Sequence, residues 1–226
     1  MARCAAVEGR GARAFLIRRD AAKRRRLERH AATRAAMNVT VSTLDAERLA
    51  DIEPEARIAV VVNGVDTVFL RTAGGEDAGI VFAGALGWFP NRDAVHFLLA
   101  EIWPILRRGN PALRLLLVGR DSPAIAGTAD QGVQVAGAVA DVRPWHDSAQ
   151  IFVRPLRIGG GTRLKVLNAL AMPKPVVSTA IGVLGLGLKA GTHYLGAETA
   201  DWRVVSLQLD EAYLLATRGA DVEAIA

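Results

Sequence analysis

The chain has 226 residues, of which 51% are hydrophobic, and a formal net charge of +5. This length and apolar content are sufficient for a buried core, and the single cysteine, Cys4, excludes internal disulfides and cysteine-based metal clusters. The four histidines are scattered without ligand spacing, so the sequence indicates no metal site and no bound cofactor. No apolar run could span a bilayer and arginines interrupt the first apolar stretch, so we expect a cytoplasmic protein without a signal peptide.

The positive charge is concentrated in residues 1–36, which hold 11 Arg and Lys against 3 acids, whereas the rest of the chain holds 17 against 20. Residues 18–36 contain few helix breakers and predict a basic helix. Such a helix fits the anionic inner surface of a membrane, and simple solvation is the alternative. Nucleic acid is a disfavoured partner, because no aromatic residues interleave with the arginines and no groove-reading element follows.

Strands and helices alternate along the rest of the chain, which indicates an α/β fold. The nearly continuous apolar strands predict a Rossmann-like parallel sheet with helices on both faces. The polar, Gly-rich residues 72–79 are the expected linker, which divides the chain into domains at 1–71 and 72–226. The predicted strands are residues 38–42, 58–63, 80–84, 113–119, 133–137, 151–155 and 176–179, and the predicted helices are 43–50, 91–107, 141–148 and 162–171.

A run of three glycines, residues 159–161, lies between a predicted strand and a helix that opens at about Thr162. Glycine permits positive φ and lets the backbone approach a ligand closely. Because a helix N-terminus also presents unpaired N–H groups, this turn could receive a diphosphate. Arg163 and Lys165 would add positive charge there or face solvent. A purely structural turn is the alternative, and the pattern matches neither the Walker nor the Rossmann fingerprint.

Glycines also stand at the ends of the neighbouring strands, at Gly84, Gly119 and Gly137. Ligands of parallel sheets bind outside the carboxyl ends of the strands. Because several strands end in glycine, the sequence predicts one binding crevice at this edge of the sheet.

Three ordered blocks resemble the donor-binding half of the group 1 glycosyltransferases of the GT-B fold: IVFAGALGWFPNRDAVHF (80–97), VAGAVADVRPW (135–145) and IFVRPLRIGGGTRLKVLNALAMPKPVVST (151–179). The most similar branch comprises sugar transferases encoded with exopolysaccharide and exosortase systems. Members of this family have two Rossmann-like domains, of which the second mainly holds the nucleotide sugar and the first mainly holds the acceptor. The resemblance implies that this chain is the second domain with the tail of the first, and that its catalytic residues are unknown because they belong to the largely missing first domain.

The resemblance implies retaining transfer of a hexose from a UDP- or GDP-linked sugar, a substrate and not a cofactor, to a glycan or lipid-linked acceptor in polysaccharide biosynthesis. A non-catalytic nucleotide-sugar-binding remnant is the alternative. A nucleotide-sugar epimerase is disfavoured, because neither tyrosine has a lysine four residues later. The implied diphosphate-binding residues are Gly84, Gly159, Gly160, Gly161, Thr162, Arg163 and Lys165, and the implied nucleoside-binding residues are Arg120, Gly137, Val139, Asp141 and Asn168.

Three positions depart from the family pattern. Asn168 replaces a glutamate that would accept hydrogen bonds from the ribose, and an uncharged acceptor is weaker. Ala85 and Asn91 stand where the wider group has an arginine and a lysine, so the resemblance leaves the diphosphate to residues 159–165. Pro173 replaces a glycine just past a helix; proline cannot adopt the left-handed conformation, so we expect this helix to end differently.

Overall fold

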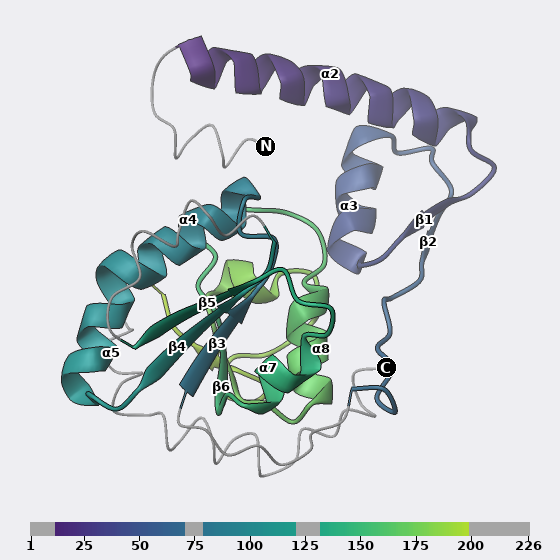
Figure 1. Cartoon of the computed structure of the whole chain (residues 1–226). Coiled ribbons are helices and arrows are strands. Elements are labelled where there is room, and N and C mark those ends of the chain that lie inside the picture. Colours follow the sequence, from purple (N-terminus) through teal and green to yellow (C-terminus); the bar gives the residue numbers. More distant parts are fainter. Residues whose placement is uncertain (1–11, 71–78, 121–131, 199–226) are drawn as a thin grey trace. The chain divides into compact units, whose positions relative to one another are not determined.

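The computed structural model describes residues 12–70, 79–120 and 132–198, whose contacts divide the chain into two units (Figure 1). Unit 1 comprises residues 1–63 with 158–162 and 184–186, and unit 2 comprises residues 64–157, 163–183 and 187–226. The predicted domain boundary at 71–72 and nearly all of the predicted linker lie outside the described residues, and that boundary stays a prediction.

Unit 1 contains the basic helix that the sequence predicts, followed by a small β–α–β motif. The strands pair in parallel, with Val39 opposite Ala59. Ser42 begins the second helix, because its hydroxyl accepts the backbone N–H of Asp45 at 3.1 Å, the usual way to satisfy a free donor at a helix start. These elements are α2 (Ala12–Arg34), β1 (Asn38–Thr40), α3 (Thr43–Ile52) and β2 (Ile58–Val60).

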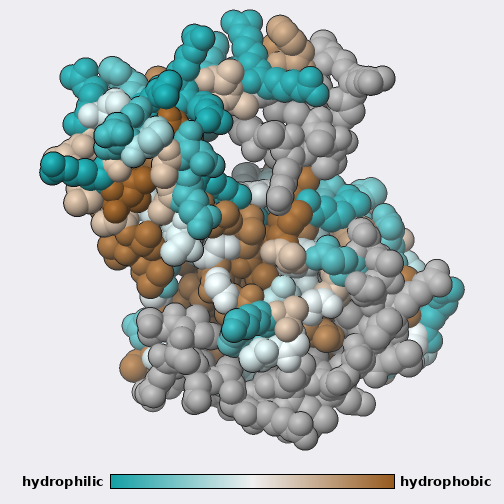
Figure 2. Space-filling view, turned by 180° about the vertical axis from the view of Figure 1, so that it is seen from behind, coloured by the Kyte–Doolittle hydropathy of each residue, from teal (hydrophilic) through white to brown (hydrophobic). Residues whose placement is uncertain are grey.

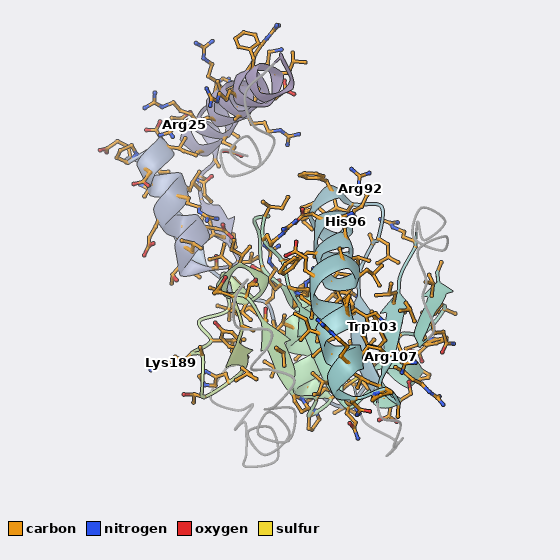
Figure 3. The ribbon with its side chains drawn as sticks, turned by 90° about the vertical axis from the view of Figure 1, so that its left-hand side faces the viewer. Arg25, Arg92, His96, Trp103, Arg107 and Lys189 are labelled. Atoms are coloured by element: carbon orange, nitrogen blue, oxygen red, sulfur yellow. The ribbon has the colours of Figure 1, made fainter. Side chains whose placement is uncertain are left out.

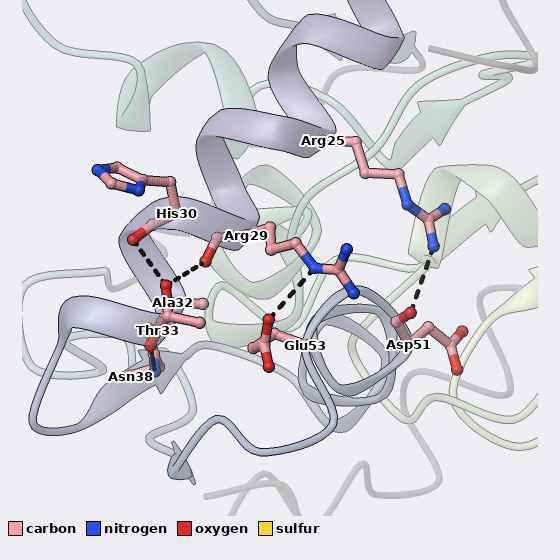
Figure 4. A network of polar contacts seen from close by, with 8 residues as sticks. All are labelled: Arg25, Arg29, His30, Ala32, Thr33, Asn38, Asp51 and Glu53. Carbon is pink, nitrogen blue, oxygen red and sulfur yellow. Dashed lines mark hydrogen bonds and ion pairs between the residues drawn. The ribbon is translucent and has the colours of Figure 1, made fainter.

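Helix α2 contacts α3 through a few polar groups near its C-terminal end (Figure 4). Arg25 Nη2 donates to the Asp51 carbonyl at 3.3 Å, and Arg29 Nε lies 3.2 Å from Glu53 Oε2. Ala32 is buried, with 3% of its surface exposed, while the other described side chains of this helix are half-buried or exposed. The basic helix of residues 18–36 is therefore confirmed as a helix, and most of its surface is solvated.

The two strands of unit 1 leave apolar surface uncovered. Figure 2 shows this as a brown area beside the hydrophilic surface of α2. The exposed valines of unit 1 include Val39 in β1 and, just after β2, Val61 and Val62, which are 63%, 59% and 60% exposed. A parallel pair is normally buried on both faces, so unit 1 is a small motif with little core of its own.

Unit 2 is built on a six-stranded parallel sheet, in the order β5-β4-β3-β6-β7-β8. Helices α4 and α5 lie on one side of this sheet, and α7 and α8 lie on the other (Figure 1). The predicted Rossmann-like sheet with helices on both faces is confirmed. Its strands are β3 (Gly79–Ala83), β4 (Arg114–Val118), β5 (Val133–Gly137), β6 (Ile151–Arg154), β7 (Val176–Ser178) and β8 (Leu195–Gly196), and its helices include α4 (Phe89–Phe97), α5 (Trp103–Gly109), α7 (Arg143–Asp147) and α8 (Leu164–Ala171).

The central strands are buried on both faces, as their continuous apolar sequences predict. Every residue of β3 and of β6 is buried, and Phe82, Leu115 and Phe152 have no exposed surface. Side chains of the helical run that begins with α4 and ends with α5, including Phe97, Leu98 and Leu106, complete the same core. Burial of such side chains, at roughly 1.5–3 kcal/mol each, fixes the carboxyl ends of the strands in relation to one another.

The helix predicted at 91–107 begins at Phe89 and ends at Gly109, and its middle is a π-helical segment, Leu98–Ile102. Figure 3 shows this run facing the viewer, with Arg92 and His96 near its start and Trp103 and Arg107 beyond the π segment. Pro104 explains the irregularity, because proline cannot donate to the residue four positions earlier and its ring clashes with that carbonyl. The Trp103 N–H bonds instead to Leu98, five positions earlier, which widens the turn.

Helix α8 ends in a way that the sequence analysis did not expect. Pro173 has a positive φ of 20°, and the Lys174 N–H still donates to the Ala169 carbonyl at 3.0 Å. That bond is the longer of the two in a Schellman motif, and the shorter one is missing because proline has no N–H. The expected departure from the glycine pattern is therefore partial, since the longer bond is kept and the shorter one is lost, with Pro173 in a strained conformation.

Replacing this proline should stabilise unit 2. The variant Pro173→Gly removes strain of about 1–3 kcal/mol, while the greater flexibility of its unfolded chain costs about 0.5–1 kcal/mol, so we expect a net gain of up to about 2 kcal/mol in the free energy of unfolding. Urea unfolding of the variant and the wild type measures it. Pro111→Gly at an exposed turn is the control and should lose stability, since Pro111 has no positive φ. Equal losses for both variants would show that Pro173 carries no strain.

Candidate functional site

Backbone hydrogen bonds join the strand ends of unit 2 at the predicted binding edge. The Gly84 N–H donates to the Val118 carbonyl at 2.9 Å, and the Gly119 N–H donates to the Gly137 carbonyl at 2.8 Å. The Leu86 N–H also donates to the Arg120 carbonyl at 2.9 Å. The structure therefore brings the glycines that end β3, β4 and β5 side by side, as the sequence predicts.

Gly84 is packed against side chains. A Cβ at this position would lie 2.7 Å from Asn91 Nδ2 and 3.3 Å from Arg154 Nη1. Asn91 Nδ2 donates to the Ala85 carbonyl at 2.9 Å, which holds the loop after β3. The side chains of Asn91 and Arg154 therefore occupy the space beside Gly84, so glycine is needed there for packing whether or not a ligand approaches it.

Arg154 is a site residue that the sequence analysis missed. It ends β6 and has only 5% of its surface exposed. Its Nη1 donates to the Ala83 carbonyl at 2.9 Å, and its Nη2 donates to Asn91 Oδ1 at 3.1 Å. The available signal was an arginine in an otherwise apolar strand, since charged residues are rarely buried without a specific partner.

Arg163 and Lys165 differ in their surroundings. Arg163 is 4% exposed, and its Nε donates to the Ile181 carbonyl at 3.1 Å, so the alternative that it faces solvent is wrong. Burial lowers the pKa of Arg163. Lys165 is half-buried on α8, close enough to His146 for its charge to lower that histidine's pKa. Asn168, on the same helix, is also half-buried.

The glycine-rich turn belongs by its contacts to unit 1. Gly159 and Gly161 have φ values of 135° and 81°, so this turn uses the conformations that glycine alone adopts readily. Nothing lies within 4 Å of a Cβ built on Gly160 or Gly161, so no neighbour excludes a side chain at either position. Thr162 precedes the helix, since α8 begins at Leu164 and not at Thr162 as predicted.

The loop after β5 holds its carboxylate in place. Asp141 forms three side-chain hydrogen bonds with Arg143, at 2.7 to 3.0 Å, and also accepts the Arg143 backbone N–H at 2.9 Å. These bonds with Arg143 lower the pKa of Asp141. Arg143 Nη1 in turn donates to the Phe69 carbonyl at 3.1 Å. Asp141 therefore holds the start of α7, and its contact with a nucleoside stays a prediction. Val139 is half-buried and Arg120 is exposed.

Within the described residues, no group of three His, Cys, Asp or Glu side chains gathers in a way that could hold a metal ion. In the same part of the chain, no helix combines the length and the apolar character needed to cross a membrane. Among the described groups of unit 2, the buried arginines near the carboxyl ends of the strands have the chemistry to bind an anion.

Comparison with known proteins gives a curated relative and several structures. An uncharacterised 44.6 kDa protein from the cps region of Klebsiella pneumoniae is 25% identical over 126 residues, which are 51% of this chain and 32% of that protein. The chain therefore spans about a third of the curated relative it matches.

Several solved structures share the fold. TarM has a TM-score of 0.71 and 12% identity, with 90% of this chain and 42% of TarM covered. Sucrose-phosphate synthase from Thermosynechococcus elongatus has a TM-score of 0.68 and 17% identity, covering 90% and 57%. HepE from Anabaena, in complex with UDP-glucose, has a TM-score of 0.65 and 14% identity, covering 89% and 64%. These likenesses confirm the GT-B type of fold, of which this chain covers a part.

The family model for group 1 glycosyl transferases matches residues 77–201, more than half of the chain. This range contains the whole described sheet of unit 2, the strand-end glycines and both buried arginines. The chain belongs to the group 1 glycosyl transferases.

Proposed function

We propose that this chain binds a nucleoside-diphosphate sugar and serves as the donor half of a retaining hexosyltransferase, which passes the sugar to a glycan or lipid-linked acceptor. The observation that carries the proposal is the family match over residues 77–201, which includes the carboxyl edge of the unit 2 sheet. Ligands of open parallel sheets bind at this edge.

Known complexes of similar proteins support the choice of donor. HepE of Anabaena was solved with UDP and glucose, and the pneumococcal O-GlcNAc transferase GtfA was solved with UDP and GlcNAc. The Klebsiella relative comes from a cps region, in keeping with a role in polysaccharide synthesis. A uridine diphosphate sugar is therefore the first donor to test.

The proposed contribution to catalysis is electrostatic. As the sugar leaves, negative charge develops on the diphosphate, and fixed positive groups that meet this charge lower the barrier. In unit 2, Arg154 and Arg163 supply the cations that meet this charge. The acceptor and the remaining catalytic groups would come from the first domain of the family, so the chain is expected to bind a donor without it.

Asn168 provides the test of donor binding. If its side chain meets the ribose, Asn168→Glu should tighten UDP or UDP-sugar binding by about 1 kcal/mol, roughly fivefold, because hydrogen bonds to charged acceptors are stronger than neutral ones. Calorimetric titration of the purified chain with UDP, GDP and ADP measures the change. A gain in affinity is informative because damage to the fold could not produce it.

Asn168→Gln is the matched control, since it has the length of glutamate without its charge and should leave affinity unchanged or weaker. If Asn168→Glu binds more loosely than Asn168→Gln, Asn168 does not face the ribose. If the wild type binds none of the three nucleotides, the donor function itself is excluded, and a remnant that keeps only the fold becomes the better reading.

The basic helix suggests where the acceptor is met. Helix α2 carries nine Arg and Lys against two acids, and we propose that it lies on an anionic membrane surface, near a lipid-linked acceptor. The chain should co-sediment with anionic vesicles. The double charge reversal Arg24→Glu and Arg26→Glu should leave most of the chain in the supernatant. Both positions are exposed, and neither belongs to the contacts with α3 in Figure 4. Equal binding to neutral vesicles would contradict this role.

A further inference from the structure

Two arginines at the end of β6 have opposite electrostatic surroundings. Arg157 Nη2 lies 2.6 Å from Asp93 Oδ1 and its Nε lies 3.1 Å from Asp93 Oδ2, a bidentate ion pair. Arg154, three residues earlier, contacts only neutral groups among the residues that the structure describes. Each guanidinium lies over a phenylalanine ring, Arg157 over Phe97 at 4.6 Å and Arg154 over Phe82 at 5.3 Å, but the Arg157 side chain is 35% exposed and Arg154 is buried.

The Arg154 guanidinium is poorly compensated for a buried cation. It is 5% exposed, and its Nε has no hydrogen-bond partner within the described part of the chain. A buried charge is normally paired, because burial removes hydration that neutral partners replace only in part. An arginine kept in such a place favours a partner that is not a residue of the described chain.

A second cation stands nearby. Arg163 precedes α8 and is 4% exposed. Burial, and then the charge of Arg163, lowers the pKa of Arg154 to about 10, so Arg154 still carries its proton at neutral pH. Both positive charges therefore act in the same region of unit 2, at the edge of the sheet where β6 ends, and the charge of Arg163 makes burial of the Arg154 cation more costly.

We propose that Arg154 binds a phosphate group of the ligand at this edge, with Arg163 contributing a second positive charge. Identification of that phosphate with the donor diphosphate rests on the proposed function. Guanidinium groups bind phosphate oxygens through two parallel hydrogen bonds, which neutral amide acceptors cannot match.

The hydrogen bonds of Arg154 indicate how a phosphate would be accepted. Its bond to the Ala83 carbonyl is fixed, because that carbonyl belongs to the backbone of β3. Its bond to Asn91 Oδ1 comes from a side chain, is longer at 3.1 Å, and can be exchanged for a phosphate oxygen. The unused Nε lies on the same planar fork, so one guanidinium could keep its backbone bond while binding the anion.

The experiment compares Arg154→Met with Arg157→Met by calorimetric titration with inorganic pyrophosphate and with UDP, and by thermal unfolding without ligand. We expect Arg154→Met to weaken pyrophosphate binding about ten- to hundredfold. The ligand-free variant should unfold at the wild-type temperature or above it, because an uncompensated buried charge is removed. Arg157→Met should do the opposite, with a lower unfolding temperature and unchanged pyrophosphate affinity, because Arg157 already has its carboxylate.

A lower unfolding temperature for Arg154→Met with unchanged pyrophosphate affinity would assign Arg154 to the packing of the β3 loop and overturn the proposal. If Arg154→Met does not fold, Arg154→Gln takes its place under the same criteria. UDP binding that persists in these variants overturns the Arg154 site and leaves the donor function standing. Pyrophosphate binding that depends on Arg154, in a chain that binds no nucleotide, supports the site and excludes the donor function. A wild-type chain that binds neither overturns both.

Discussion

Unit 2 should lose stability as the pH falls from 7.5 to 5, because of one buried histidine. His146 is 1% exposed, neither ring nitrogen has a hydrogen-bond partner within the described residues, and its ring stacks on Phe152 with centroids 5.3 Å apart. Burial, followed by the charges of Lys165 and Lys174, lowers the pKa of His146 from 6.5 to about 4. The histidine is therefore neutral in the folded protein over most of this range.

The sign follows from where protons bind. Below pH 6.5 the unfolded chain takes up a proton at His146, whereas the folded chain does so only near pH 4, so acid favours the unfolded state. The free energy of unfolding should fall by about 2 kcal/mol between pH 7.5 and pH 5, and by about 3 kcal/mol in all by pH 4. Urea unfolding at a series of pH values measures this slope.

The variant His146→Leu should remove most of that slope, because leucine fills a similar volume and does not titrate. His96→Leu, at an exposed position on α4, is the matched control and should keep the wild-type slope. An unchanged slope in His146→Leu would assign the acid sensitivity to other groups. Acidic residues add their own losses mainly below pH 5, so the upper part of the range is the decisive one.

The main architecture of unit 2 could be predicted because its strands are continuous apolar runs that end in glycine. Phe82 and Leu117 lie in such runs, and their burial follows from the two covered faces of a parallel sheet. The short β8 was missed, since its two residues, Leu195–Gly196, have no pattern long enough to read. The basic helix was predictable for another reason, because its sequence is rich in alanine and arginine, which favour helix, and contains no proline or glycine after residue 12.

The site was less predictable, because its contacts join distant parts of the chain. Arg154 meets the carbonyl of Ala83, 71 positions away, and the side chain of Asn91, 63 positions away. No local rule indicates that an arginine at the end of an apolar strand will meet these two groups. Asp141 shows that a local contact can be missed as well, since its carboxylate accepts hydrogen bonds from Arg143, only two positions away.

A side chain at the strand-end glycine Gly119 should cause a large loss of stability. Gly119 has a φ of 151°, and a Cβ on it would overlap the Gly84 carbonyl oxygen and lie 2.7 Å from the Gly84 carbonyl carbon. Both neighbours are backbone and cannot rotate away. Any side chain at Gly119 must push β3 and β4 apart at the proposed binding edge, where the Gly84 N–H bonds to Val118 and the Gly119 N–H bonds to Gly137.

We therefore expect Gly119→Ala to destabilise unit 2 by about 3–5 kcal/mol, from strain at a glycine-only conformation together with overpacking. Gly187→Ala is the matched control, because Gly187 has a φ of 69° and nothing within 4 Å of its Cβ, so only about 1 kcal/mol of backbone strain applies. Urea unfolding of both variants isolates the overlap as the difference between them. Equal losses of stability in the two variants would mean that the ends of β3 and β4 separate easily. The contact between Gly119 and Gly84 would then not fix the position of Gly84 for a ligand.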